Sequence, residues 1–268
     1  MNKPFCDWFL RPPAHCHDGV YYFDSDRDAD YFDESNVAIW RDGRMKRNFH
    51  SDFFLNNPAS RRLVDHIVGQ GVPVVEIACG PGMGLTPSVK RLAPDHVCLA
   101  TDASALVIEE WKRYLDENET VSNLELAQFS LMDIPFRDNT VPAYSSYIGI
   151  SSTRNGEEGH EQALREIYRT LMKNGFLYTI ETTWTDTEAM LRVFRETGKT
   201  PWSGLGSDHR APTWRERFLN AGFEILSEEV FESRTFTSDD NELGEAAEQL
   251  GIEIGVFSKA YILQKASH

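Results

Sequence analysis

The sequence predicts an α/β fold, with a doubly wound, mostly parallel sheet covered by helices on both faces. From Arg61 onward, helical and extended apolar segments alternate, as they do in successive strand–helix–strand units. Two of the extended segments, 72–78 and 96–102, are short and almost continuously apolar, which is typical of strands buried on both faces. The length of 268 residues suits one such domain with an extension.

The composition excludes several classes of protein. With 27 basic and 42 acidic residues, the formal charge is −15, so the chain has no general attraction for nucleic acid or anionic membrane. A content of 41% hydrophobic residues argues against disorder. We find neither an apolar run of about 18 residues nor a signal peptide. Four cysteines are too few for a disulfide scaffold, so we expect a reducing, cytoplasmic location.

The elements follow in a regular order up to Thr182. Strands are expected at 72–78, 96–102, 124–130, 143–150 and 176–182. Helices are expected at 59–68, 87–93, 105–118 and 161–174. Thr86 before Pro87 and Ser104 have the character of N-caps, and Gly175 is expected to stop the fourth helix.

The alternation of helices and strands is less regular on either side of this region. After Thr182 we expect helices and strands separated by polar insertions: helices at 187–197 and 212–222, strands at 224–233 and 255–265, and insertions near 199–212 and 234–253. Residues 1–58 are rich in aromatics and acids without a sustained period, which predicts an extension of short helices and loops. Residues 59–268 then form the core domain.

The segment 76–84, EIACGPGMG, follows a buried strand and precedes a helix. Glycines there let backbone N–H groups approach a ligand, at the end of the sheet where ligands bind. A dinucleotide fingerprint would need glycine at Leu85, and the G-K-[ST] of a P-loop is absent. Glu76 would repel a pyrophosphate but can pair with an amine, so the ligand is expected to carry an amino-acid end.

Asp102 stands at the tip of the second strand, twenty residues past Gly82. A carboxylate at this place accepts hydrogen bonds from both ribose hydroxyls of a bound nucleoside. A nucleoside joined to an amino acid is S-adenosylmethionine, and this is the cofactor that the two acids predict.

The sequence resembles the class I S-adenosylmethionine-dependent methyltransferases over roughly residues 60–268. The resemblance is carried by VVEIACGPGMGLT, LATDAS, FSLMDIPFRDNT, EQALREIYRTLMKNGFLYTIE and WRERFLNAGFEI, which occur in the family's order and spacing. It implies a seven-stranded, Rossmann-like methyltransferase fold, with S-adenosylmethionine as the cofactor and S-adenosylhomocysteine as the product.

The resemblance also implies roles for single residues. Glu76 and the adjoining glycine loop are expected to hold the methionine portion, Asp102 the ribose, and Ala103 the adenine. The expected cofactor-binding residues are Glu76, Ala78, Cys79, Gly80, Gly82, Asp102, Ala103, Ser130, Leu131 and Tyr147. Ala78 stands where the family usually has glycine. Ser130 stands where an Asp often binds the adenine amine, so this contact is expected to weaken or to pass to the backbone at Leu131.

Methyl transfer from a sulfonium is an in-line displacement that needs alignment and, for a protonated acceptor, a base. Family geometry places the acceptor beside Tyr147, which either contacts it or packs in the strand-end core. Glu181 and His209 are the candidate general bases, with a loop charge and a surface histidine as the alternatives. Trp184 is a candidate for the acceptor pocket, and Arg210 is a candidate to clamp a carboxylate.

The N-terminal part resembles a lid. The stretch 28–40, DADYFDESNVAIW, is similar to the opening that precedes the core in many small-molecule methyltransferases, where it folds over the cofactor. Tyr31 and Trp40 are therefore candidates to contact the acceptor, although a packing role is the alternative. Cys6 and the run 15–17 match no zinc pattern, so no metal is predicted.

The prediction is a methyltransferase that acts on a small molecule, with no nucleic-acid or membrane partner. One alternative is a protein or tRNA methyltransferase, but a tRNA enzyme would be expected to have a basic surface. The other is a catalytically degenerate homologue that binds the cofactor as a partner subunit. The acidity favours a neutral or cationic acceptor, and the sequence does not distinguish a monomer from a homodimer.

Overall fold

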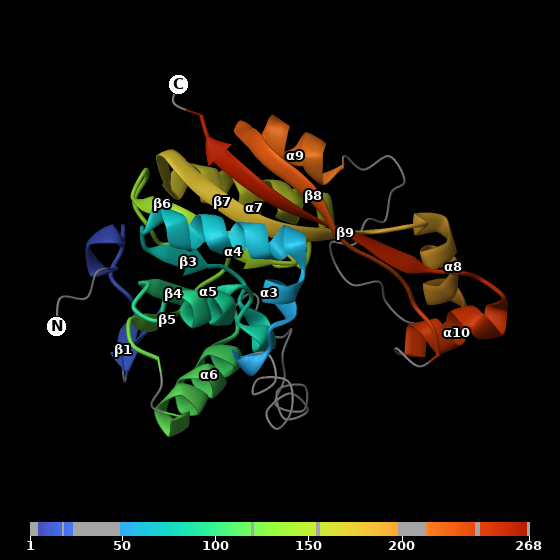
Figure 1. The fold of residues 1–268 in the computed structure, drawn as a ribbon, viewed down its shortest axis with the longest axis horizontal. Coiled ribbons are helices and arrows are strands. Elements are labelled where there is room, and N and C mark those ends of the chain that lie inside the picture. The colour runs from blue at the N-terminus through green and yellow to red at the C-terminus, as the bar shows by residue number, and fades with distance from the viewer. Residues whose placement is uncertain are drawn as a thin grey trace.

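The structure, a computed structural model, describes residues 5–17, 19–23, 49–118, 121–153, 156–197, 213–238 and 242–266. Figure 1 shows their arrangement as a twisted sheet with helices packed against it. Four candidate residues lie outside the described ranges: Tyr31, Trp40, His209 and Arg210.

The described strands form one nine-stranded sheet in the order β1-β2-β5-β4-β3-β6-β7-β9-β8. Their bounds are β1 His15–His17, β2 Val20–Tyr22, β3 Val74–Glu76, β4 Cys98–Asp102, β5 Leu124–Gln128, β6 Val141–Tyr147, β7 Leu171–Trp184, β8 Phe223–Thr235 and β9 Gly255–Lys265. Strands β2 to β7 pair in parallel along the sheet, whereas β9 is antiparallel to β7 and to β8. The predicted α/β, mostly parallel fold is confirmed.

Two strands more than the predicted seven come from the N-terminal extension. We expected short helices and loops there, but β1 and β2 form a hairpin, and β2 adds to β5 in parallel with Val20 opposite Leu126. The short helices Cys6–Trp8 and Phe53–Asn56 agree with the prediction, but the hairpin was missed because three-residue strands are too short to show a period. Phe9, Tyr21 and Phe23 are buried in the main core, so this hairpin covers the sheet edge with an apolar contact.

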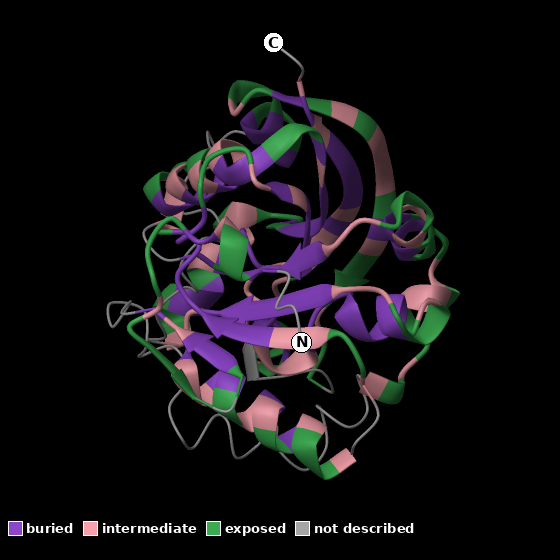
Figure 2. Cartoon of the chain, turned by 90° about the vertical axis from the view of Figure 1, so that its left-hand side faces the viewer, coloured by how far each residue is buried: buried purple, intermediate pink, exposed green. Residues whose placement is uncertain are grey.

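Helices cover both faces of the sheet. The described helices are α3 Phe53–Asn56, α4 Pro58–Gln70, α5 Thr86–Leu92, α6 Ala105–Asn118, α7 Gly156–Thr170, α8 Thr187–Thr197, α9 Trp214–Asn220 and α10 Glu242–Leu250, with single turns of 3-10 helix at Cys6–Trp8 and Gly80–Gly82. In β3, Val74 packs with α4 and α5, whereas Val75 packs on the face covered by α7 and α9. Both residues are fully buried, as Figure 2 shows for the central strands generally.

The fourth predicted helix ends four residues early. Helix α7 stops at Thr170, whose hydroxyl donates to the Glu166 carbonyl oxygen at 2.8 Å, and β7 begins at once with Leu171. Gly175 does not cap the helix. It lies where the register of β6 and β7 shifts, and a Cβ there would come within 2.9 Å of the carbonyl oxygens of Met172 and Pro142. The glycine therefore marks a close backbone approach.

Beyond the main sheet, the outer ends of β7, β8 and β9 carry a small second core. It lies to the right in Figure 1, where α8 packs beside α10. Met190 and Phe194 from α8 meet Ala247 from α10, together with Ile254 and Trp184. The insertion predicted near 234–253 therefore contains a helix that buries apolar surface.

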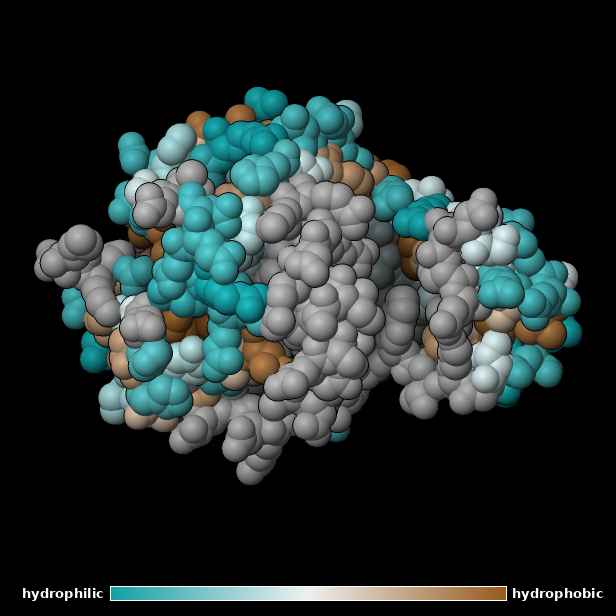
Figure 3. Space-filling model, turned by 90° about the horizontal axis from the view of Figure 1, so that it is seen from below, coloured by the Kyte–Doolittle hydropathy of each residue, from teal (hydrophilic) through white to brown (hydrophobic). Residues whose placement is uncertain are grey.

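The surface fits the acidic composition. Figure 3 shows the molecule from below, with hydrophilic side chains over most of the described surface and apolar ones in small patches. None of the described helices has the length and apolar character needed to cross a membrane.

Candidate functional site

The loop after β3 is built from residues in left-handed backbone conformations. Ala78 has φ 48°, Gly80 φ 52°, Met83 φ 55° and Gly84 φ 51°. Glycine adopts such angles freely, but a residue with a Cβ is disfavoured by about 1–2 kcal/mol. Alanine at position 78, where glycine was expected, is therefore accommodated by the loop, but with a conformational cost that glycine would not have.

Glu76 lies at the end of β3, completely buried beneath this loop. Its Oε2 accepts hydrogen bonds from Ser145 Oγ at 2.6 Å, Leu85 N at 3.1 Å and Thr86 Oγ1 at 3.4 Å. Its Oε1 has no hydrogen-bond partner within the described residues. A Cβ at Gly84 would overlap this carboxyl group, so glycine is needed there for Glu76 to take its position.

Burial raises the pKa of Glu76 to about 8, although hydrogen bonds from Ser145, Leu85 and Thr86 oppose the rise. A buried carboxyl oxygen without a partner is costly, and a cationic donor is the group that compensates it best. The site is therefore suited to a ligand ammonium group.

Asp102 ends the neighbouring strand β4 and joins the two loops of the site. Its Oδ2 accepts from Gly80 N and its Oδ1 from Ser104 N, both at 2.9 Å. Burial raises the pKa of Asp102 to about 6. Trp111 Nε1 donates to the Gly80 carbonyl oxygen at 2.8 Å, so both sides of this glycine's backbone are fixed.

The end of β5 brings the expected adenine contacts beside Asp102. Phe129 N donates to the Asp102 carbonyl oxygen at 3.0 Å, and Gln128 Nε2 donates to that of Ala103 at 2.9 Å. Ser130 and Leu131 follow directly and are each 6% exposed. The structure thus gathers Ala103, Ser130 and Leu131 at the same edge of the sheet as Glu76 and Asp102.

Tyr147 is half-buried at the end of β6. Its ring packs edge-on against Phe54, at 4.9 Å between centroids, and lies 6.1 Å from Phe231. These contacts favour the packing role over direct catalysis.

Glu181 is buried in β7, with 1% of its surface exposed. Ser151 N donates to its Oε2 at 2.9 Å and Thr179 Oγ1 to its Oε1 at 2.5 Å. Burial raises the pKa of Glu181 to about 7. Because both oxygens already accept hydrogen bonds, the geometry favours a role in holding the loop after β6 over that of a general base.

Trp184 is not brought into the cofactor site, and Cys79 lies in the loop after β3 without a reactive thiol. Trp184 packs in the second core, where its ring meets those of Phe194 and Phe236. Cys79 is buried, which raises its thiol pKa well above the usual range and makes it a poor nucleophile. Among the described residues, no three His, Cys, Asp or Glu side chains gather as metal ligands would.

Sequence reasoning missed the residues that support the two acids. Ser145 lies opposite Glu76 in the pairing of β3 with β6 and makes its shortest hydrogen bond. A serine within the apolar run 141–147 was the available signal. Trp111 gave no signal, because a helical aromatic usually indicates only core packing.

The comparisons with known proteins agree with this geometry. Residues 74–175 match a family model described as a methyltransferase domain. A demethylmenaquinone methyltransferase of Listeria welshimeri is 25% identical over 127 residues, which cover 47% of this chain and 52% of that protein. The match thus spans about half the length of the curated relative.

Solved structures show the same fold at low identity. The geranyl diphosphate methyltransferase bound to GPP and sinefungin has a TM-score of 0.52 and 17% identity, over 75% of each chain. The (4+2)-cyclase SpnF has a TM-score of 0.51 and 20% identity, over 78% of this chain and 82% of that one. The fold is therefore shared by proteins named for different reactions, and it does not fix the chemistry.

Proposed function

We propose that this chain, which belongs to the class I S-adenosylmethionine-dependent methyltransferases, transfers a methyl group from S-adenosylmethionine to a small-molecule acceptor. The observation that carries the proposal is the buried Glu76 carboxyl group, which has one oxygen held by three donors and the other without a described partner. That oxygen is suited to the ammonium of the cofactor's amino-acid end.

The other residues of the site have complementary parts in this proposal. Asp102 accepts the ribose hydroxyls, which requires a change in its present bond to Gly80 N. Ala103, Ser130 and Leu131 contact the adenine. S-adenosylmethionine supplies an electrophilic methyl group, and the chain's contribution is to hold the donor and exclude water, so that an acceptor in line with the sulfur can react.

The acceptor is proposed to be a neutral or cationic small molecule. The formal charge of −15 disfavours a nucleic-acid partner. All four thiols are free, which supports a cytoplasmic location. Because a relative is named for demethylmenaquinone, a reduced naphthoquinol is the first acceptor to test.

The experiment has two arms. Calorimetric titration with S-adenosylhomocysteine measures cofactor binding, and transfer of a labelled methyl group to a panel of small acceptors measures turnover. We expect saturable binding with one site per chain and labelling of at least one acceptor. Absence of binding would refute the proposal, and binding without turnover on any acceptor would favour the degenerate, cofactor-binding alternative. Following the methyl group itself is essential, since a cyclase shares the fold.

A further inference from the structure

The segment that follows β5, residues 129–138, is held in place from two sides. At its start it is tied to the cofactor site, because Phe129 N donates to the Asp102 carbonyl oxygen. Ser130 Oγ is engaged locally, since it accepts from Met132 N at 3.2 Å. The position of the segment's backbone therefore depends on contacts made further along it.

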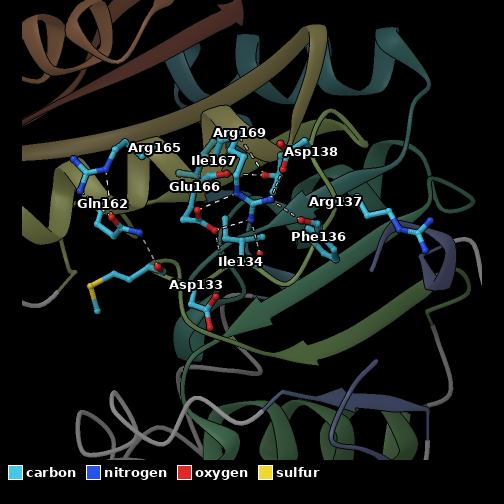
Figure 4. Close-up of polar contacts among 12 residues, drawn as sticks. Asp133, Ile134, Phe136, Arg137, Asp138, Gln162, Arg165, Glu166, Ile167 and Arg169 are labelled. Atoms are coloured by element: carbon cyan, nitrogen blue, oxygen red, sulfur yellow. Dashed lines mark hydrogen bonds and ion pairs between the residues drawn. The ribbon is translucent and has the colours of Figure 1, made fainter. Parts of the chain in front are cut away.

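Three residues of α7 supply those contacts: Gln162, Glu166 and Arg169. Their spacing of four and three places them on one face of the helix. Gln162 Nε2 donates to the Met132 carbonyl oxygen at 3.1 Å, and Glu166 Oε2 accepts from Ile134 N at 3.1 Å. Figure 4 shows these side chains pointing from the helix toward the segment.

Arg169 makes the largest number of these contacts. Its Nη2 donates to the Ile134 carbonyl oxygen at 2.8 Å and its Nη1 to that of Phe136 at 2.9 Å. The same guanidinium pairs with Glu166 at 2.7 Å and with Asp138 at 2.7 Å. A planar group with five donors can satisfy this arrangement, whereas a lysine ammonium cannot span it.

The opposite side of the segment is held by the N-terminal residues. Leu10 N donates to the Pro135 carbonyl oxygen, and Arg137 N donates to that of Trp8, both at 2.8 Å. Arg11 pairs with Asp133 through two hydrogen bonds. The segment thus lies between α7 and the N-terminal extension, and the contacts that α7 makes to its main chain are half-buried.

We propose that Gln162, Glu166 and Arg169 are positioning residues that set the adenine specificity of the cofactor site. This inference rests on the proposed function. Ser130 is shorter than the acid that its position is expected to carry, and one lone pair of its Oγ accepts from Met132 N, so the main part of adenine recognition falls on the backbone of residues 130–132. Gln162 binds the Met132 carbonyl oxygen of that backbone directly, and Glu166 and Arg169 fix the main chain that follows it, at Ile134 and Phe136.

The test uses two single variants of the full chain, Arg169→Lys and Gln162→Ala. The second removes the hydrogen bond to the Met132 carbonyl oxygen and two exposed hydrogen bonds from Arg165 on the same helix, and alanine is a strong helix former, so this variant preserves the fold even where the first does not. Arg61→Lys is the control, because Arg61 also pairs with an acid on its own helix but contacts no loop carbonyl among the described residues.

Two measurements separate a positioning role from a merely structural one. Hydrogen exchange reports on residues 130–136. Titration with S-adenosylhomocysteine and with its inosine analogue, which has a carbonyl in place of the adenine amine, reports on specificity. We expect faster exchange, binding of S-adenosylhomocysteine weakened about fivefold to tenfold, and a reduced preference over the analogue. The control should change none of these.

An unchanged preference between the two nucleosides in the folded variants would overturn the inference, whatever happens to overall affinity. Unchanged exchange at 130–136 would overturn it as well. Failure of the unsubstituted protein to bind S-adenosylhomocysteine is a different result. It would refute the proposed function, and the adenine role would fall with it.

Discussion

Replacement of Glu76 by Gln separates the hydrogen bonds of this side chain from its negative charge. The amide oxygen can take the place of Oε2 and keep the three donors, and the amide nitrogen can take the place of Oε1, which has no described partner. The variant should therefore fold, but it cannot ionise, so it lacks the negative charge that Glu76 carries above its pKa of about 8 and that an ammonium group requires. We expect it to gain stability and to lose cofactor affinity.

The stability change follows from the pKa of Glu76, which is about 8 against an ordinary value of 4.5. Because the folded protein holds this proton more tightly than the unfolded chain, the associated stability is present below pH 4.5 and is lost as the pH rises through 8. At 1.36 kcal/mol per pH unit, the loss amounts to roughly 5 kcal/mol. Glu76→Gln should not lose this stability, because its amide does not titrate, and it should be the more stable protein at pH 8.5.

The affinity change follows from the charge. A hydrogen bond to a charged group contributes about 1.5–3 kcal/mol, so binding of S-adenosylhomocysteine should weaken by about 10-fold to 100-fold. Calorimetry gives the affinity and urea unfolding at several pH values gives the stability. Glu229→Gln is the control, because Glu229 pairs with Arg62 at the surface. Unchanged affinity in Glu76→Gln would refute the placement of the ammonium.

Three further substitutions test other parts of the site. Asp102→Ala removes the acceptor of Gly80 N and of the proposed ribose contact, and it should weaken binding of S-adenosylhomocysteine by about 1–3 kcal/mol in a titration; equal affinity would argue against the ribose site. Ala78→Gly relieves a φ of 48° and should raise the unfolding free energy by about 1 kcal/mol; a lower melting temperature would contradict this account of the loop. Glu181→Gln should leave methyl transfer within a few-fold of the original, whereas a loss of turnover with intact folding would restore the general-base role.

The parts of the site that the sequence predicted are local in the chain. Glu76, the glycine loop and Asp102 each stand directly after a buried strand, and parallel strands in a doubly wound sheet present such ends at one edge. Their proximity therefore followed from the alternation of strands and helices alone. Ser145 and Trp111 contact the same loops from distant positions, and neither has a sequence signal beyond that of an ordinary strand or helix residue.

The parts that the sequence did not predict depend on long-range contacts. Strands β1 and β2 are defined by their pairing with each other and by that of β2 with β5, since a three-residue strand has no period of its own. Gly175 was predicted to end a helix, which was wrong; its constraint comes from the carbonyl oxygens of Met172 and of Pro142 on the neighbouring strand. The contacts of Arg169 with Ile134 and Phe136 could likewise not be predicted, because an arginine in a helix gives no indication of which loop it binds.

The most direct test of the central claim is a crystal structure of the complex with S-adenosylhomocysteine. We expect the cofactor's ammonium within hydrogen-bond distance of Glu76 Oε1, the ribose hydroxyls within hydrogen-bond distance of Asp102, and the adenine between Ala103 and the backbone of residues 130–132. A cofactor bound with its amino-acid end away from Glu76, or its ribose away from Asp102, would contradict the account.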